Sequence, residues 1–310
     1  MISLPLPSSV PPAPFCLLIP LGPDAAELAR LEDLMDACLA FADLPLVAVI
    51  INDGNDADAI QRIGHARGLP TTVRPNARRG RGNWWVGGLD MAMIDALGWI
   101  AVNQPCCAVL RLDSDALVIG PYAHLIASHF AADPTLGMMG NFDSPTGARR
   151  APGHAVTTRL YWRSKRVSHD RESKRIIFSF WGWRRRIRLL IRRAMQHGYV
   201  LGDWCQGGAY ALSPELLRRL AADPFFARPR EFLHVDFCED VLMALVVHAL
   251  GLRIHYTIGP ARLFASKWQG LVAAPETLAE AGHSIIHSIN SHPGRSEDDI
   301  RALFKSRRPS

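Results

Sequence analysis

Two aspartates separated by one serine, Asp113 and Asp115, directly follow the mostly apolar run from Ala108 to Leu112. Such a run predicts a buried strand, and open α/β sheets place their ligands at the carboxyl ends of their strands. Two carboxylates there suit a hard divalent cation, Mg²⁺ or Mn²⁺, that also holds a substrate diphosphate. Asp and Ser are also common residues of strand-ending turns, so the pair alone leaves both interpretations open.

Five further features could do chemistry, and they occur in a fixed order around the aspartate pair. They are Asp53 after another apolar run, the loop from Asn76 to Asn83 with Arg78, Arg79 and Arg81, the pair Gly207-Gly208, the pair Glu239-Asp240, and His287. Arginines among glycines before a helix suit diphosphate contacts, because backbone N–H groups and guanidinium groups both favour anions. Each feature also has a purely structural interpretation, as a turn, a β-bulge, a helix N-cap or a buried histidine.

Alternating strand and helix patterns must position these residues. Apolar runs at 15–20, 46–51 and 108–112 predict buried strands, and the segments between them carry apolar residues at helical spacing. This alternation predicts an α/β fold with a mostly parallel central sheet and helices on both of its faces. A strong helix from Glu239 to Leu250 and a strand from Arg253 to Ile258 follow later.

Composition limits the kinds of protein that this chain can be. Its 310 residues, 48% hydrophobic and 21% charged, are enough for one large α/β domain. No apolar run reaches the roughly 18–20 residues of a membrane span, and the N-terminus lacks the pattern of a secretory signal. Six cysteines without C-x-x-C spacing favour reduced thiols, and we therefore expect a cytoplasmic protein.

The positive charge is concentrated in one segment. Residues 159–193 hold 13 Lys and Arg against 2 Asp and Glu, a surplus of +11, so the rest of the chain carries −5 of the total of +6. A solvated loop, a membrane-surface element and a nucleic-acid site are all open interpretations. Because apolar and cationic residues alternate over 163–193, we favour contact with an anionic membrane surface. The negative remainder argues against a broad nucleic-acid surface, and no nucleic acid is expected as a partner.

In the order and spacing of these groups, the chain resembles the GT-A glycosyltransferases, specifically the large inverting family 2 with many bacterial members. The resemblance runs from about Phe15 to Ser291 and implies a single GT-A domain over 15–291. It implies a nucleotide-sugar-binding half (15–142), a basic Arg/Trp-rich insert (143–200) and an acceptor and catalytic half (201–291). Residues 1–14 are then an N-terminal arm, and 292–310 a polar C-terminal helix or tail.

The resemblance also implies a role for each candidate residue. Donor binding falls to Asp53, Asn76, Arg78, Arg79, Arg81, Asp113 and Asp115, acceptor binding to Gly207, Gly208 and Glu239, catalysis to Asp240 as general base, and metal binding to Asp113, Asp115 and His287. Trp204 is a further candidate, because its ring could stack on an acceptor sugar. His283 and His292 compete with His287. The acidic pair usual after the second strand is Asn52-Asp53 here, one carboxylate fewer.

The implied reaction is metal-dependent, inverting transfer of a sugar from a UDP- or GDP-linked donor to a hydroxyl of a glycan or glycolipid. The implied place is bacterial surface-glycan assembly, in the cytoplasm or at the inner face of its membrane. A divalent cation would neutralise the leaving diphosphate, and a carboxylate would accept the hydroxyl proton.

Two other functions remain as alternatives. One is nucleotidyl transfer to a sugar phosphate, although no Gly-rich, Lys-containing phosphate motif follows the first strand. The other is nucleic-acid binding through the Arg-rich segment.

Overall fold

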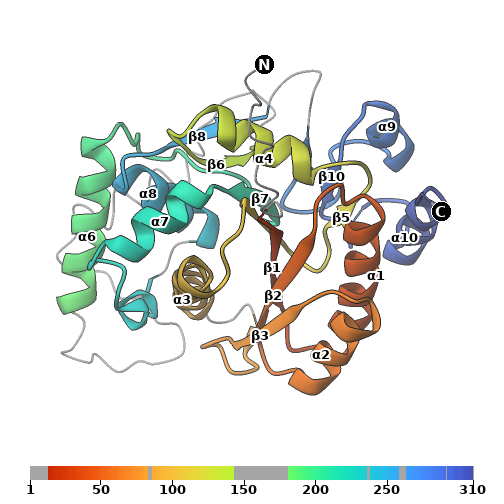
Figure 1. Ribbon diagram of the computed structural model, residues 1–310, viewed down its shortest axis with the longest axis horizontal. Coiled ribbons are helices and arrows are strands. Elements are labelled where there is room, and N and C mark those ends of the chain that lie inside the picture. Colours follow the sequence, from red (N-terminus) through yellow and green to blue (C-terminus); the bar gives the residue numbers. More distant parts are fainter. Residues whose placement is uncertain are drawn as a thin grey trace, which may run out of the picture.

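The structure is a computed structural model that describes residues 13–82, 86–142, 181–235, 238–257, 263–290 and 292–309 (Figure 1). Most of the predicted N-terminal arm, Asn83, and residues 143–180 of the predicted insert lie outside the described residues. All six cysteines are free thiols, and four of them are buried. Among the described residues, no helix combines the length and apolar character needed to cross a bilayer.

The central sheet has seven strands in the spatial order β3-β2-β1-β4-β7-β6-β8. Its strands are β1 (Phe15–Leu21), β2 (Leu46–Asn52), β3 (Thr71–Pro75), β4 (Ala108–Leu112), β6 (Leu136–Gly140), β7 (Ala209–Leu212) and β8 (Arg253–Tyr256). Strands β1 to β4 are mutually parallel, β6 is parallel to β8, and β7 is antiparallel to both of its neighbours. The predicted mostly parallel α/β sheet is therefore confirmed.

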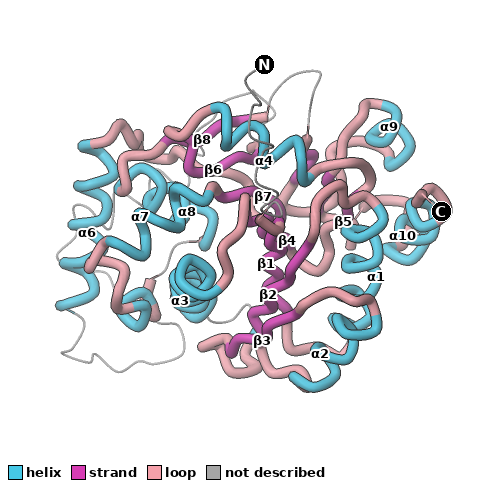
Figure 2. Tube along the Cα trace, in the orientation of Figure 1, coloured by secondary structure: helices cyan, strands magenta, loops and turns pink. Residues whose placement is uncertain are grey.

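Helices cover both faces of this sheet. Side chains alternate between the two faces along each strand, and both faces are apolar here. In β1, Cys16 and Leu18 face one apolar core while Phe15 and Leu17 face the other. The first core is completed by α3 (Val86–Asn103), α6 (Trp181–Gln196), α7 (Pro214–Ala222), α8 (Glu239–Ala249) and the 3₁₀ helix η3 (Pro229–Phe232). The second is completed by α1 (Ala26–Ala40), α2 (Ala57–Ala66), α4 (Ala123–Ala132), α9 (Pro275–Glu280) and α10 (Glu297–Lys305). Figure 2 shows the strands stacked between these two groups of helices.

The order of the strands creates a crevice at one edge of the sheet. Strand β1 pairs with β2 on one side and with β4 on the other. From β1 to β3 the chain adds strands toward one side of the sheet, and with β4 it begins to add them on the other side. Ligands of open α/β sheets bind at this type of switch point, outside the carboxyl ends of the strands. The aspartate pair follows β4 directly and therefore lies at this crevice.

Two other segments reach the same edge through strand pairing. Because β7 is antiparallel to β4, its start lies beside the end of β4, and the Asp113 N–H donates to the Gly208 carbonyl at 2.7 Å. A small sheet of β5 (Leu117–Val118), β10 (Ile285–His287) and β9 (Phe264–Ser266) brings in the third segment. Ile286 pairs with Leu117, so His287 comes next to the aspartates.

The C-terminal helix is an integral part of this edge. Ile300 and Phe304 of α10 are buried in the core, and Arg301 forms an ion pair with Asp33 of α1 at 2.8 Å. The same Arg301 donates from Nη2 to the carbonyl of Ser114 at 2.9 Å. The loop that carries the two aspartates is thus tied to the last helix of the chain.

The basic segment is described only from residue 181 on, where it forms α6. Ile187, Leu190 and Ile191 are fully buried against α8 in the first core, and Arg186 pairs with Glu231 at 2.5 Å. Three of the apolar residues that suggested a membrane-binding helix are therefore core residues, whereas Leu189 is exposed. The sequence pattern could not distinguish the two, because both need an apolar stripe at helical spacing.

We expect Ile191→Ala to destabilise the protein by about 2–5 kcal/mol, because it opens a cavity in a closed core. Leu189→Ala is the matched control on the same helix, since Leu189 is 45% exposed, and it should cost no more than about 0.5 kcal/mol. Urea unfolding followed by circular dichroism measures both. Equal losses in the two variants would contradict this packing of α6.

Candidate active site

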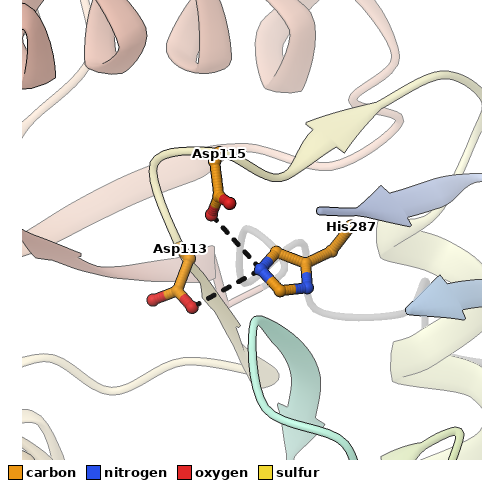
Figure 3. Close-up of side chains that lie close together, drawn as sticks. All are labelled: Asp113, Asp115 and His287. Atoms are coloured by element: carbon orange, nitrogen blue, oxygen red, sulfur yellow. Dashed lines mark ion pairs between the residues drawn. The ribbon is translucent and has the colours of Figure 1, made fainter. Parts of the chain in front are cut away.

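Asp113, Asp115 and His287 converge at the end of β4 (Figure 3). His287 Nε2 lies 3.2 Å from Asp115 Oδ1 and 3.7 Å from Asp113 Oδ2, and one potential ligand atom from each side chain falls within 4.8 Å of the others. Two carboxylates and an imidazole at this spacing fit a divalent cation. His283 and His292 are not part of this cluster, so among the described histidines His287 is the one beside the aspartates.

Asp115 and His287 shift each other's pKa. Burial by itself raises the pKa of Asp115, but the hydrogen bond and charge of His287 and the hydroxyl of Ser288 lower it to about 2. Burial also lowers the pKa of His287, and the two aspartates reverse the effect and raise it. Ser288 Oγ donates to Asp115 Oδ2 at 2.7 Å. The two aspartates therefore favour a positive charge beside them.

Gly208 leaves the room that His287 occupies. Its φ is +89°, and a Cβ at this position would lie 2.2–2.4 Å from three atoms of the imidazole ring. Only glycine combines this backbone conformation with so close an approach. Gly207, predicted to give space to an acceptor sugar, lines the cleft, and its N–H donates to Asp240 Oδ2 at 3.1 Å.

The triad lies in a cleft of about 1180 Å³. Segments that follow β1 and β3 line one part of it, with Asn76, Arg78 and Arg81 among them. Residues around β7, α8 and the small sheet line another part, including Glu239, Asp240 and Trp268. The cleft can therefore hold an anionic group beside the arginines and a second group beside the carboxylates at once.

Asp53 and Arg79 are not among the residues that line this cleft. The Asp53 carboxylate is buried and accepts from the N–H groups of Gly80 at 2.7 Å and Gly82 at 2.9 Å. Asp53 therefore stabilises the conformation of the arginine loop without lining the cleft itself. Arg78 is buried, which lowers its pKa, while nearby carboxylates, Asp53 first among them, oppose the shift.

Glu239 and Asp240 begin α8 and are both buried. Burial raises the pKa of Asp240 to about 6, although the N–H groups of Val241 and Gly207 favour its charged form. Burial likewise raises the pKa of Glu239 to about 7, against the opposing charge of Arg111. Carboxyl groups with pKa values of about 6 and 7 can gain or lose a proton close to neutral pH, which suits them to acid–base chemistry.

Arg111, within strand β4, is a site residue that the sequence analysis missed. It is 2% exposed, and its Nη2 lies 2.9 Å from Asp113 Oδ1 and 3.3 Å from Glu239 Oε2. Burial by itself lowers the pKa of Arg111, but these two carboxylates outweigh burial and raise it. Arg111 thus links the triad of Asp113, Asp115 and His287 to α8. A single arginine inside an otherwise apolar strand, two residues before the aspartates, was the available signal.

Trp204 does not reach the cleft. It is 8% exposed and packs in the first core, so stacking on a bound sugar would require it to leave that core. Glu239 does line the cleft, and its Oε1 accepts a hydrogen bond from the hydroxyl of Tyr210. Its carboxylate is therefore already engaged by Tyr210 and Arg111.

Comparison with known proteins finds similarity in three-dimensional structure. No protein-family model and no curated protein matches the chain. The mannosyltransferase PcManGT from Pyrobaculum calidifontis, in complex with GDP-Man and Mn²⁺, is 19% identical with a TM-score of 0.41, over 81% of this chain and 58% of that one. The bifunctional glycosyltransferase WbbM is 11% identical with a TM-score of 0.47, over 98% of this chain and 53% of that one.

The galactosyltransferase LgtC, in complex with donor and acceptor sugar analogs, is 11% identical with a TM-score of 0.47, over 94% of this chain and 95% of that one. The chain thus spans little more than half the length of PcManGT and WbbM. All three are glycosyltransferases, the class that the sequence resemblance names. At such identities, the function has to follow from the side chains of this chain.

We expect Gly208→Ala to weaken Mn²⁺ binding by about 10–100-fold, because the added methyl group displaces the His287 ring. Gly198→Ala is the matched control: its φ of +91° imposes the same backbone strain, but nothing lies within 4 Å of the added methyl group. Calorimetric titration with Mn²⁺ measures both variants. An Mn²⁺ affinity of Gly208→Ala equal to that of Gly198→Ala would contradict the assignment of His287 as a ligand.

Proposed function

We propose that this protein is a metal-dependent glycosyltransferase that moves a sugar from a nucleoside-diphosphate donor to a hydroxyl of a glycan or glycolipid. The observation that carries the proposal is the meeting of the Asp113–Asp115–His287 triad with two buried carboxylic acids in one cleft. The triad suits a metal-bound diphosphate, and the acids suit proton transfer. Transfer of a sugar to a hydroxyl needs both.

Asp113, Asp115 and His287 would hold the divalent cation. When bound, the cation would act as a Lewis acid that offsets the negative charge on the departing nucleoside diphosphate. A mixed set of carboxylates and imidazole suits Mn²⁺ better than Mg²⁺, which prefers oxygen ligands alone. Ser288 supports the set by orienting Asp115.

The donor would lie along the part of the cleft that follows β1 and β3. Arg78 and Arg81 supply positive charge for the diphosphate of a UDP- or GDP-linked sugar. The N–H groups of Gly80 and Gly82 are occupied by Asp53, so the guanidinium groups would bind the anion. Asp53 then acts by holding this loop in shape, rather than by touching the donor itself as the resemblance implied.

Asp240 would be the general base. Its raised pKa gives it more basicity than an ordinary aspartate, and the N–H groups of Val241 and Gly207 fix its orientation. Attack by the hydroxyl on the face of the sugar opposite the diphosphate would invert the anomeric carbon. Arg111 and Tyr210 would hold Glu239 beside it, and Gly207 would leave space for the acceptor.

Cellular location and membrane contact are further parts of the proposal. We place the enzyme in the cytoplasm, at the inner face of the membrane where lipid-linked acceptors are assembled. The exposed side of α6 carries Arg185 and Arg192, which suit an anionic surface, although its buried side does not take part.

Release of the nucleoside diphosphate from a panel of UDP- and GDP-sugars, with Mn²⁺ and with a chelator, tests the reaction. We expect chelation or Asp115→Asn to reduce release at least 100-fold, because the leaving diphosphate loses its counter-charge. Asp298→Asn, at an exposed aspartate of α10, should leave it unchanged. Release of pyrophosphate from a mixture of a nucleoside triphosphate and a sugar 1-phosphate, with no nucleoside diphosphate released from the sugar nucleotides, would instead identify a nucleotidyltransferase.

Asp240→Asn should lower kcat by about 10²–10⁴-fold while donor affinity persists, because an amide cannot accept the proton. In the wild type, kcat should fall as the pH drops below about 6, since a base with a pKa of about 6 becomes protonated there. The Asn variant should lack this acid limb. NMR of the first product should show the inverted anomer, and a retained anomer would contradict direct attack.

A further inference from the structure

Trp268 is the most exposed large apolar side chain among the described residues, with 75% of its surface accessible. It also lines the cleft, together with its neighbour Gln269. Single exposed apolar residues are ordinary on protein surfaces, but a tryptophan at the wall of a cleft presents about the largest flat apolar face that a side chain offers. Its position therefore suggests a ligand that covers this face.

The turn that carries Trp268 is fastened to the strand of a metal ligand. Ser266 of β9 pairs with His287 of β10, and the Lys267 N–H donates to the His287 carbonyl at 2.8 Å. On the other side of the turn, the Ser288 N–H donates to the Gly270 carbonyl at 3.2 Å. Trp268 is thus held at a defined place relative to the metal triad.

This place differs from the one proposed for the donor. The donor-side residues follow β1 and β3, whereas β9 and β10 contact β7, the strand that Gly207 and Gly208 precede. In the strand order, β7 and β1 lie on opposite sides of β4, where the aspartates are. A group stacked on Trp268 would therefore lie on the Gly207 side of the metal triad.

We propose that Trp268 is the stacking platform for a pyranose ring of the acceptor, an inference that rests on the proposed glycosyltransferase function. A pyranose has an apolar C–H face that can cover an indole, and hydroxyl groups at its edge that can bond to the amide of Gln269. Sugar stacking was expected of Trp204, but Trp204 is a core residue. Trp268 takes over that role because, among the tryptophans whose side chains the structure describes, it is the one exposed in the cleft.

Steady-state kinetics with Mn²⁺, an active UDP- or GDP-hexose, and a panel of methyl hexopyranosides and disaccharides tests this role. Trp268→Ala should raise the acceptor KM at least tenfold, while the donor KM and the slow hydrolysis of the donor in the absence of acceptor stay within twofold. Trp268→Phe should recover much of the acceptor affinity, since it restores an aromatic face. Val102→Ala is the control, because Val102 is 72% exposed and is not among the residues lining the cleft.

An unchanged acceptor KM in Trp268→Ala, with a melting temperature equal to that of the wild type, would overturn the inference. A raised donor KM with an unchanged acceptor KM would also overturn it and would assign the indole to the nucleobase. Calorimetric titration of the same saccharides without donor separates this test from that of the reaction. If the wild type transfers no sugar but binds saccharides through Trp268, the platform stands and the proposed reaction fails.

Discussion

Asp113, Asp115, Glu239 and Asp240 lie in one cleft, and the rest of the site depends on how their charge is balanced. Asp113 and Asp115 face His287, while Glu239 faces Arg111, which also contacts Asp113. A buried carboxylate without a partner costs several kcal/mol, so the arginine in β4 is a condition for placing α8 so near the aspartates. Burial raises the pKa of Asp240 to about 6 and that of Glu239 to about 7, and the charges of Asp240 and Asp113 add to the shift of Glu239.

The backbone supports this balance through one reversed strand. Since β7 runs against its neighbours, the two glycines before it meet the end of β4 and leave space for an imidazole. A parallel strand in that place would have put its start at the opposite edge. The site is therefore a consequence of topology as much as of residue types, and α10 secures it through the carbonyl of Ser114.

Several parts of the site were readable from local patterns, and others were not. The aspartates, the arginine loop and the start of α8 each stand next to a strand or helix whose periodicity marks it. Trp268 went unnoticed because nothing local distinguishes an exposed ring from a buried one. A lone arginine in an apolar strand was a local signal for Arg111, but it does not identify Asp113 and Glu239 as the partners of that arginine. Trp204 and the apolar stripe of α6 misled for the same reason, since burial depends on what packs against a side chain.

The sequence by itself determined the class of fold, because hydrophobic periodicity is local and dictates alternating strands and helices. It also determined which side chains could bind a metal or move a proton. Only the tertiary structure decided that His287, and neither His283 nor His292, joins the aspartates, and that Asp53 supports a loop instead of lining the cleft. Such choices depend on strand pairing between residues more than 150 positions apart, which no local pattern encodes.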